Sequence, residues 1–172
     1  MSKHLNFADK KENRKDFVMS MHTWTVTGYG IDGDVLNKVK IENLREFVQK
    51  YYTDVPDLAE CFTSDDFDNN EESLEGFMEG LDFFEDENGN MGVGALIAAV
   101  MNAQNNIELS YCCDSNGKKG IVLDTLLPWE YSEAEASLSP GLLMEIFKKT
   151  FAELGVEITM HDLDKQEFAF FG

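Results

Sequence analysis

Lysine and arginine are missing from the middle of this sequence. Neither occurs from Tyr51 to Gly117, although acids recur from Asp54 to Glu87. Over all 172 residues, 33 acids outnumber 14 lysines and arginines, which gives a formal net charge of -19. A surface of this charge repels nucleic acid and anionic membranes, and attracts cations or basic proteins. We therefore expect neither direct nucleic-acid binding nor membrane binding.

Cysteines and long apolar runs are also scarce. The three cysteines, Cys61, Cys112 and Cys113, are too few for a disulfide framework. Neighbouring residues of a strand point to opposite faces, so Cys112 and Cys113 would not bind one zinc ion together. The longest apolar run, Val93 to Met101, is shorter than the ~20 residues that span a bilayer. The charged amino terminus lacks the apolar segment of a signal peptide, so we expect a soluble, cytoplasmic protein.

Motifs that carry catalysis are absent as well. The sequence holds no glycine-rich phosphate loop, no His-Glu-x-x-His, no Gly-x-Ser-x-Gly and no Cys-x-x-Cys. His22 and His161 fall on predicted strands and could be neighbours, an arrangement that is more often structural than catalytic. Carboxylate pairs for acid–base chemistry are too numerous to single one out. We expect a protein that is not an enzyme and needs no cofactor.

What the chain does contain fits one folded domain. A length of 172 residues, a hydrophobic fraction of 43% and 13 phenylalanines supply a normal core. Residues 1–16 are basic, and are either a mobile arm or a leader upstream of a later start at Met19 or Met21. Such an arm could fold back on the acidic face. Residues 17–172 are expected to form a single α+β domain.

Alternation and turn signals predict about four strands in one mostly antiparallel sheet. The expected strands are His22 to Ile31, Ile107 to Cys113, Ile121 to Leu127 and Val156 to His161. A turn at residues 32–34 ends the first strand, and Asn116-Gly117 is a hairpin signal between the second and third. The phenylalanine-rich segment 168–171 is expected to dock as a tail.

Apolar residues at helical spacing predict four to five helices. They are expected at Ile41 to Tyr52, Pro56 to Phe62, Glu71 to Phe84, Gly92 to Ala103 and Ser139 to Leu154. The segment from Thr63 to Asn70 is a polar, acidic connection. The helix that begins at Gly92 is small and apolar nearly all round, so it should be central and buried.

The helix expected from Glu71 to Phe84 has two distinct sides. Apolar residues at i, i+3, i+4 and i+7 predict the side that faces the core, which is formed by Leu74, Phe77, Met78 and Leu81. Acids share another side of the helix, namely Glu72, Glu75, Glu79 and Asp82. Gly76 and Gly80 lie between the two sides and would allow a close helix crossing.

The acids of this helix and its flanks form the candidate partner-binding surface. Its members are Asp65, Asp66, Asp68, Glu71, Glu72, Glu75, Glu79, Asp82, Glu85, Asp86 and Glu87. Successive helical acids rise by ~6 Å, within about a factor of two of the ~3.4 Å charge spacing along a DNA strand. We therefore expect a module that occupies the nucleic-acid-binding surface of a basic protein, with an affinity that falls with salt.

A cation bound by residues 82–90 is a weaker alternative. A calcium-loop frame that starts at Asp86 places Asn88 and Asn90 correctly. The same frame puts Met91 where glycine is required and Ile97 where glutamate is required. The loop therefore has only a superficial likeness to a calcium site, and no metal is expected.

Three segments resemble those of a known group of proteins. They are the opening Thr23 to Gly30 (TWTVTGYG), the small-residue helix Gly94 to Val100 (GALIAAV) and the closing amphipathic helix. The group consists of small acidic proteins of bacterial prophages and mobile elements, and the resemblance spans Met21 to Met160. The basic residues 1–16 depart from it. Similar accessory proteins include anti-CRISPR inhibitors, which implies a location in the host bacterial cytoplasm and a CRISPR effector nuclease as the basic partner.

An adaptor or assembly protein of such an element is the alternative hypothesis, with charge serving only solubility. Its contact with a partner protein would be apolar and insensitive to salt, through Phe168 to Phe171 or through Trp129. Trp129 and Tyr131 follow the strand-breaking Pro128, and covering the core is the more ordinary role for both aromatic residues.

Overall fold

A computed structural model describes residues 22–125 and 141–171 of the chain. Within these ranges the protein is a single α+β domain, as predicted, with one four-stranded antiparallel sheet and six α-helices. Three sequence-based expectations lie outside the described residues. They concern the basic arm at 1–16, the aromatic side chains of Trp129 and Tyr131, and the start of the last expected helix at Ser139.

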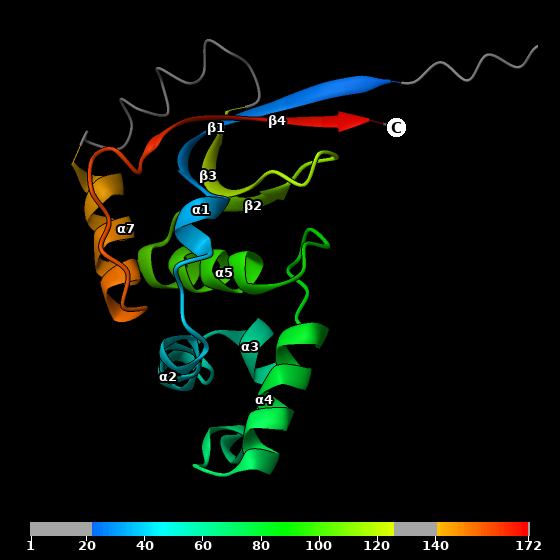
Figure 1. The fold of residues 1–172 in the computed structure, drawn as a ribbon, viewed down its shortest axis with the longest axis vertical. Coiled ribbons are helices and arrows are strands. Elements are labelled where there is room, and N and C mark those ends of the chain that lie inside the picture. The colour runs from blue at the N-terminus through cyan, green and yellow to red at the C-terminus, as the bar shows by residue number, and fades with distance from the viewer. Residues whose placement is uncertain (1–21, 126–140, 172) are drawn as a thin grey trace, which may run out of the picture.

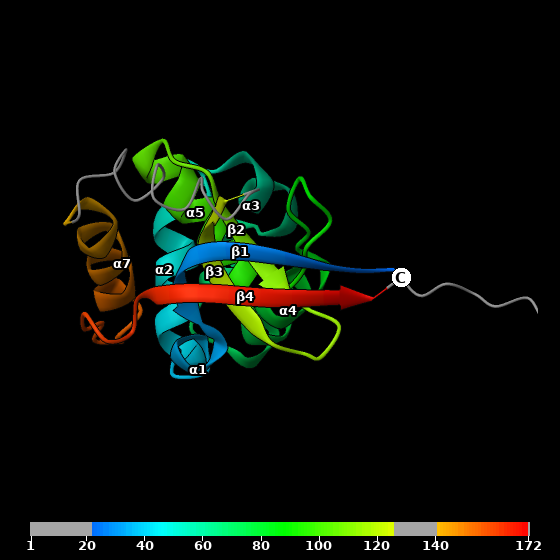
Figure 2. The same cartoon turned by 90° about the horizontal axis from the view of Figure 1, so that it is seen from above.

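The sheet confirms the first strand and the hairpin. It contains β1 (Thr23–Asp32), β2 (Leu109–Cys113), β3 (Lys119–Thr125) and β4 (Asp164–Phe171) in the order β2-β3-β1-β4. Thr27–Asp32 of β1 pair with β3, whereas pairing with β4 extends back to Thr23. Among the described residues, the start of β1 therefore pairs only with β4, and these two strands run out side by side as a ribbon (Figures 1 and 2).

The strand predicted at Val156–His161 is wrong. Val156 and Ile158 are buried, but this segment joins no strand of the described chain, and Met160 is 76% exposed. The Asp162 carboxylate accepts hydrogen bonds from the N–H and the hydroxyl of Thr159, which closes a turn there. The last strand is instead the phenylalanine-rich segment, which enters the sheet as β4 rather than docking on it as a tail.

The sheet curls so that β4 reaches back to the β2–β3 hairpin. The carboxylate of Asp114 in the hairpin accepts a hydrogen bond of 3.0 Å from the N–H of Ala169. Glycine at position 120 permits this closure, because a Cβ there would lie 2.8 Å from the ring of Phe168. Phe168 and Val122 are thereby fully buried in a small second core. This core lies on the opposite face of the sheet from the helices.

The other face of the sheet packs on α5 (Val93–Asn105), the buried central helix that the sequence predicts (Figure 1). Gly94 lies against the ring of Tyr111, and a Cβ at this position would overlap that ring. The last helix, α7 (Leu142–Glu153), contributes Leu143, Ile146 and Phe147 to the core. Gly155 follows α7 with a φ of 71°, which is the left-handed conformation expected after a helix.

The remaining helices form the end of the molecule away from the sheet (Figure 1). They are α2 (Ile41–Tyr51), α3 (Pro56–Cys61), the 3-10 helix η1 (Ser64–Phe67) and α4 (Glu71–Phe83). The short α1 (Gly33–Leu36) replaces the predicted turn, because the Asp32 side chain accepts from the N–H of Asp34 and caps it. The predicted polar connection is also more ordered than expected, since it contains η1 with a buried Phe67.

Candidate acidic docking surface

The helix α4 buries a different side from the one that its apolar residues predict. Phe77 and Leu81 are buried as expected, but Leu74 and Met78 are 41% and 44% exposed. Gly80, expected between the two sides, is buried. The prediction of one apolar core stripe is therefore half wrong.

The two glycines of α4 explain the rotation of this helix about its own axis. A Cβ at position 80 would lie 2.6 Å from the ring of Phe62 and 2.8 Å from the carbonyl oxygen of Cys61. Glycine therefore allows α4 to cross α3 closely, as the sequence predicts. Gly76 faces the Asp66 carboxylate of η1 instead of another helix. The side of α4 that carries Gly76 and Gly80 therefore faces α3 and η1, and the apolar Leu74 is turned toward solvent.

Six of the eleven predicted acids line one hollow between η1 and α4. We call it the acidic hollow, and its carboxylates belong to Asp65, Asp66, Asp68, Glu72, Glu75 and Glu79. It has a volume of about 500 Å³, and Asn70, Ser73 and Gly76 complete its lining. No lysine or arginine of the described chain lines it.

The other five predicted acids lie outside this hollow. Glu71 and Asp82 are exposed on α4. Glu85 pairs with Met91 in an isolated bridge that closes the loop after α4. Asp86 and Glu87 line a separate groove beside α5 and β2, with a volume of about 460 Å³. The continuous run of acids in the sequence is therefore divided between two surfaces.

The position of η1 depends on Arg45 of α2. Its guanidinium donates two hydrogen bonds of 2.9 and 2.7 Å to the backbone carbonyl of Asp66, and one of 2.6 Å to that of Asp68. Asp66 also caps η1, since its carboxylate accepts from the N–H of Thr63 at 2.7 Å. Arg45 therefore holds the backbone of η1 while the carboxylates remain turned to the hollow. The sequence gives no sign of this contact between distant segments.

None of the eleven acids forms an ion pair with a lysine or arginine of the described residues. The ion pairs there are Lys50–Glu153 and Lys165–Glu167, and neither includes one of the eleven acids. Like charges four residues apart, such as Glu75 and Glu79, destabilise a helix by about 0.2–0.5 kcal/mol per pair. The acidic hollow therefore weakens the fold that carries it.

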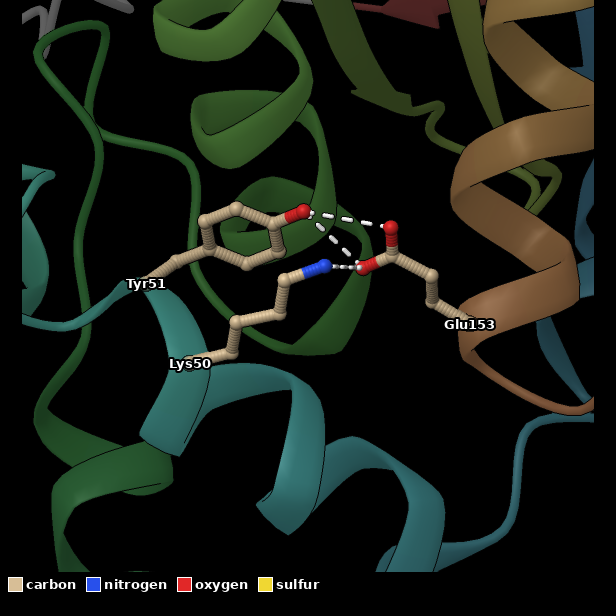
Figure 3. A network of polar contacts seen from close by, with 3 residues as sticks. All are labelled: Lys50, Tyr51 and Glu153. Atoms are coloured by element: carbon tan, nitrogen blue, oxygen red, sulfur yellow. Dashed lines mark hydrogen bonds and ion pairs between the residues drawn. The ribbon is translucent and has the colours of Figure 1, made fainter.

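A contrasting polar network joins α2 to α7 (Figure 3). The Tyr51 hydroxyl donates to Glu153 Oε2 at 2.9 Å, and Lys50 Nζ lies 3.0 Å from the same oxygen. Burial raises the pKa of Tyr51, and the hydrogen bond with Tyr51 followed by that with Glu153 raises the pKa of Lys50. Here a carboxylate is satisfied by its own chain and ties two helices together.

The histidines and the loop after α4 gain no support as a site. His22 and His161 lie on no strand, contrary to expectation. The register places Thr23 opposite Phe171, so His22 adjoins one end of the β1–β4 ribbon while His161 precedes the other. The described residues contain no group of three or more His, Cys, Asp or Glu able to hold a metal ion.

The Asp86 carboxylate has an internal role in its loop. One of its oxygens accepts from the N–H groups of Asn88 and Asn90 at 2.9 and 2.8 Å. The other oxygen accepts from the Asn90 side-chain amide at 3.0 Å. Asp86 therefore closes the turn between α4 and α5.

Comparison with protein-family models, curated proteins and solved structures finds no match. Within the described ranges, no helix has the length and apolar character needed to cross a membrane.

Proposed function

We propose that this protein is an acidic inhibitor that docks the acidic hollow on the nucleic-acid-binding surface of a basic protein. It acts by binding and carries out no reaction. Bound there, it would exclude nucleic acid from its partner.

The observation that carries this proposal is the convergence of six carboxylates from two elements on one hollow. No lysine or arginine of the described chain neutralises them, and Arg45 is engaged by backbone carbonyls instead. The six carboxylates repel one another in the free protein. A cationic surface that covers them relieves this repulsion, and the relief adds to the binding free energy of a basic partner.

Surfaces that bind nucleic acid are the natural complement, because they present lysines and arginines spaced to neutralise phosphates. The resemblance to prophage accessory proteins favours a CRISPR effector nuclease among such partners. Effectors of this kind hold the guide–target duplex in a positively charged channel. The inhibitor would act in the cytoplasm of the host bacterium.

A pull-down from host lysate, followed by mass spectrometry, tests this function. At about 50 mM salt, the tagged chain should retain a basic nucleic-acid-binding protein, and at about 500 mM salt it should lose it. Duplex DNA or guide RNA added in excess should release the same protein. Retention that is indifferent to both salt and nucleic acid would overturn the proposal.

An adaptor with a salt-insensitive contact is the second candidate, and one observation favours it. Trp24 and Phe171 at the free end of the β1–β4 ribbon are 52% and 45% exposed, and Trp24 stacks on Phe170 at 5.6 Å. Phe168, expected at this contact, is fully buried and unable to take part. Substitution of Trp24 and Phe171 by serine should abolish partner retention if the adaptor hypothesis holds, and leave it unchanged if the acidic hollow is the contact.

A further inference from the structure

Within the part of the chain that the structure describes, the edge strand β2 leaves some of its backbone without a partner. There it pairs only with β3, and residues of an antiparallel strand turn their N–H and C=O groups alternately toward and away from the neighbour. Leu109 turns them away, because both bond the Asn102 side chain of α5, at 2.7 and 2.8 Å. Because the direction alternates, Tyr111 and Cys113 also turn their N–H and C=O groups away from β3. Among the described residues, nothing outside the sheet bonds their outward backbone groups.

A groove lies beside this edge. Its volume is about 460 Å³, and its lining includes the small side chains of Ala98, Ala99 and Ala103 on α5, opposite the start of β2. The loop of residues 86–88 forms another wall. Because these side chains are small, space remains between α5 and the outer edge of β2. A strand added to β2 would lie in this direction, about 4.8 Å from it.

The groove also has a charge preference. Its lining includes Asp57, Glu87 and Glu108, besides Asp86 with its internal hydrogen bonds, and no lysine or arginine. Side chains of a strand alternate between two faces, so an extended segment can turn aliphatic residues to the alanines and basic residues to the acids.

We propose that an extended, lysine- or arginine-containing segment of a partner protein docks here by adding a strand to the outer edge of β2. The groove follows Ile107 to Ser110, and the Asn102 side chain already occupies the edge at Leu109. The segment would therefore lie in the groove and continue along β2, and its backbone hydrogen bonds would be confined to Tyr111 and Cys113. This site is separate from the acidic hollow and uses backbone hydrogen bonds as well as charge.

Amide hydrogen exchange of the full chain, with and without a synthetic peptide, tests this site. The probe alternates lysine and valine over about seven residues, a common strand length, and its control alternates glutamate and valine. The lysine peptide should slow exchange of the Tyr111 and Cys113 amides by about tenfold, because both become hydrogen-bonded. The glutamate peptide should leave both amides unchanged.

Two variants separate strand addition from general charge attraction. Cys113→Pro removes an outward N–H at an edge position that tolerates proline, and should weaken lysine-peptide binding about fivefold, whereas Cys113→Ala should not. Protection confined to α4 and η1, or equal binding by both Cys113 variants, would overturn the proposal. If Cys113→Pro lowers the unfolding temperature, the exchange of Tyr111 and Cys113 in the unsubstituted chain decides the matter alone.

Discussion

The two ends of this molecule treat their carboxylates in opposite ways. At the sheet end, Asp114 accepts hydrogen bonds from the N–H groups of Asn116, Lys118 and Ala169, at 2.9, 2.8 and 3.0 Å. At the helical end, the acids of the hollow face one another, and no lysine or arginine of the described chain pairs with them. Acids of the first kind stabilise the fold. Those of the second kind have no basic partner in the described chain, and among them Asp66 also caps η1.

The contrast separates candidate functional acids from structural ones. Net charge alone ranks all 33 acids equally. Hydrogen bonding separates them. A carboxylate that accepts several hydrogen bonds from its own chain has a structural role, whereas a carboxylate surrounded only by like charges has no such role. Substitutions at the two ends should therefore change the free energy of unfolding in opposite directions.

The largest effect is expected from Phe168→Ala at the sheet end. This side chain is fully buried between β4 and the hairpin, so its loss should lower the free energy of unfolding by about 3–5 kcal/mol. Phe171→Ala, at a site that is 45% exposed, is the matched control and should cost far less. Urea unfolding followed by circular dichroism measures both, and equal costs would show that β4 does not pack as described.

A second effect concerns the Asp114 carboxylate and its dependence on pH. The backbone hydrogen bond from Ala169, followed by those from Lys118 and Asn116, lowers the pKa of Asp114 below 3.8. Its stabilisation is therefore fully present above pH 3.8 and is lost as the pH falls through the lowered pKa. Asp114→Asn should destabilise the protein at neutral pH, and the difference from the unsubstituted protein should shrink below pH 3.8 in urea titrations. A constant difference would contradict this role.

A smaller effect is expected where α2 meets α7. Tyr51→Phe removes the hydrogen bonds to Glu153 but keeps the ring, so it should lower the free energy of unfolding by about 0.5–1.5 kcal/mol. The solvent-exposed Thr53→Ala on the following turn serves as a control. Thermal unfolding at neutral pH measures the loss, and no change in Tyr51→Phe would show that the network does not join the helices.

The smallest effect has the opposite sign. Glu75→Gln together with Glu79→Gln relieves two like-charge pairs of α4, Glu71–Glu75 and Glu75–Glu79, and should raise the free energy of unfolding by about 0.4–1 kcal/mol at low salt. The gain should vanish at about 1 M salt, where charges are screened beyond ~3 Å. Loss of stability on this double substitution would mean that the hollow contributes to the fold after all.

Much of the architecture could be predicted because its signals are local. Gly155 ends α7, Gly117 takes a φ of 81° in the hairpin, and the apolar run after Gly92 is the buried α5. The predicted last strand is wrong for a non-local reason. Val156 and Ile158 alternate as strand residues do, but the partner of β1 lies beyond the turn that Asp162 closes.

The candidate site could be predicted only in outline. The run of acids is plain in the sequence, but the division of its members between the hollow and the groove is not. That division depends on Arg45 of α2 holding η1, and on Gly80 letting α4 roll onto Phe62. Periodicity specifies that a helix has an apolar side, whereas contacts with other elements decide how far that side is buried.

The most direct measurement compares two variants of equal charge. One combines Glu72→Gln, Glu75→Gln and Glu79→Gln in the hollow, and the other combines Glu60→Gln, Glu145→Gln and Glu157→Gln at exposed sites elsewhere. Titration calorimetry against the basic protein retained from lysate should give an affinity at least about tenfold weaker for the hollow variant, equivalent to about 1.4 kcal/mol, and little change for the other. Equal loss in both, or loss in neither, would contradict the acidic hollow as the docking surface.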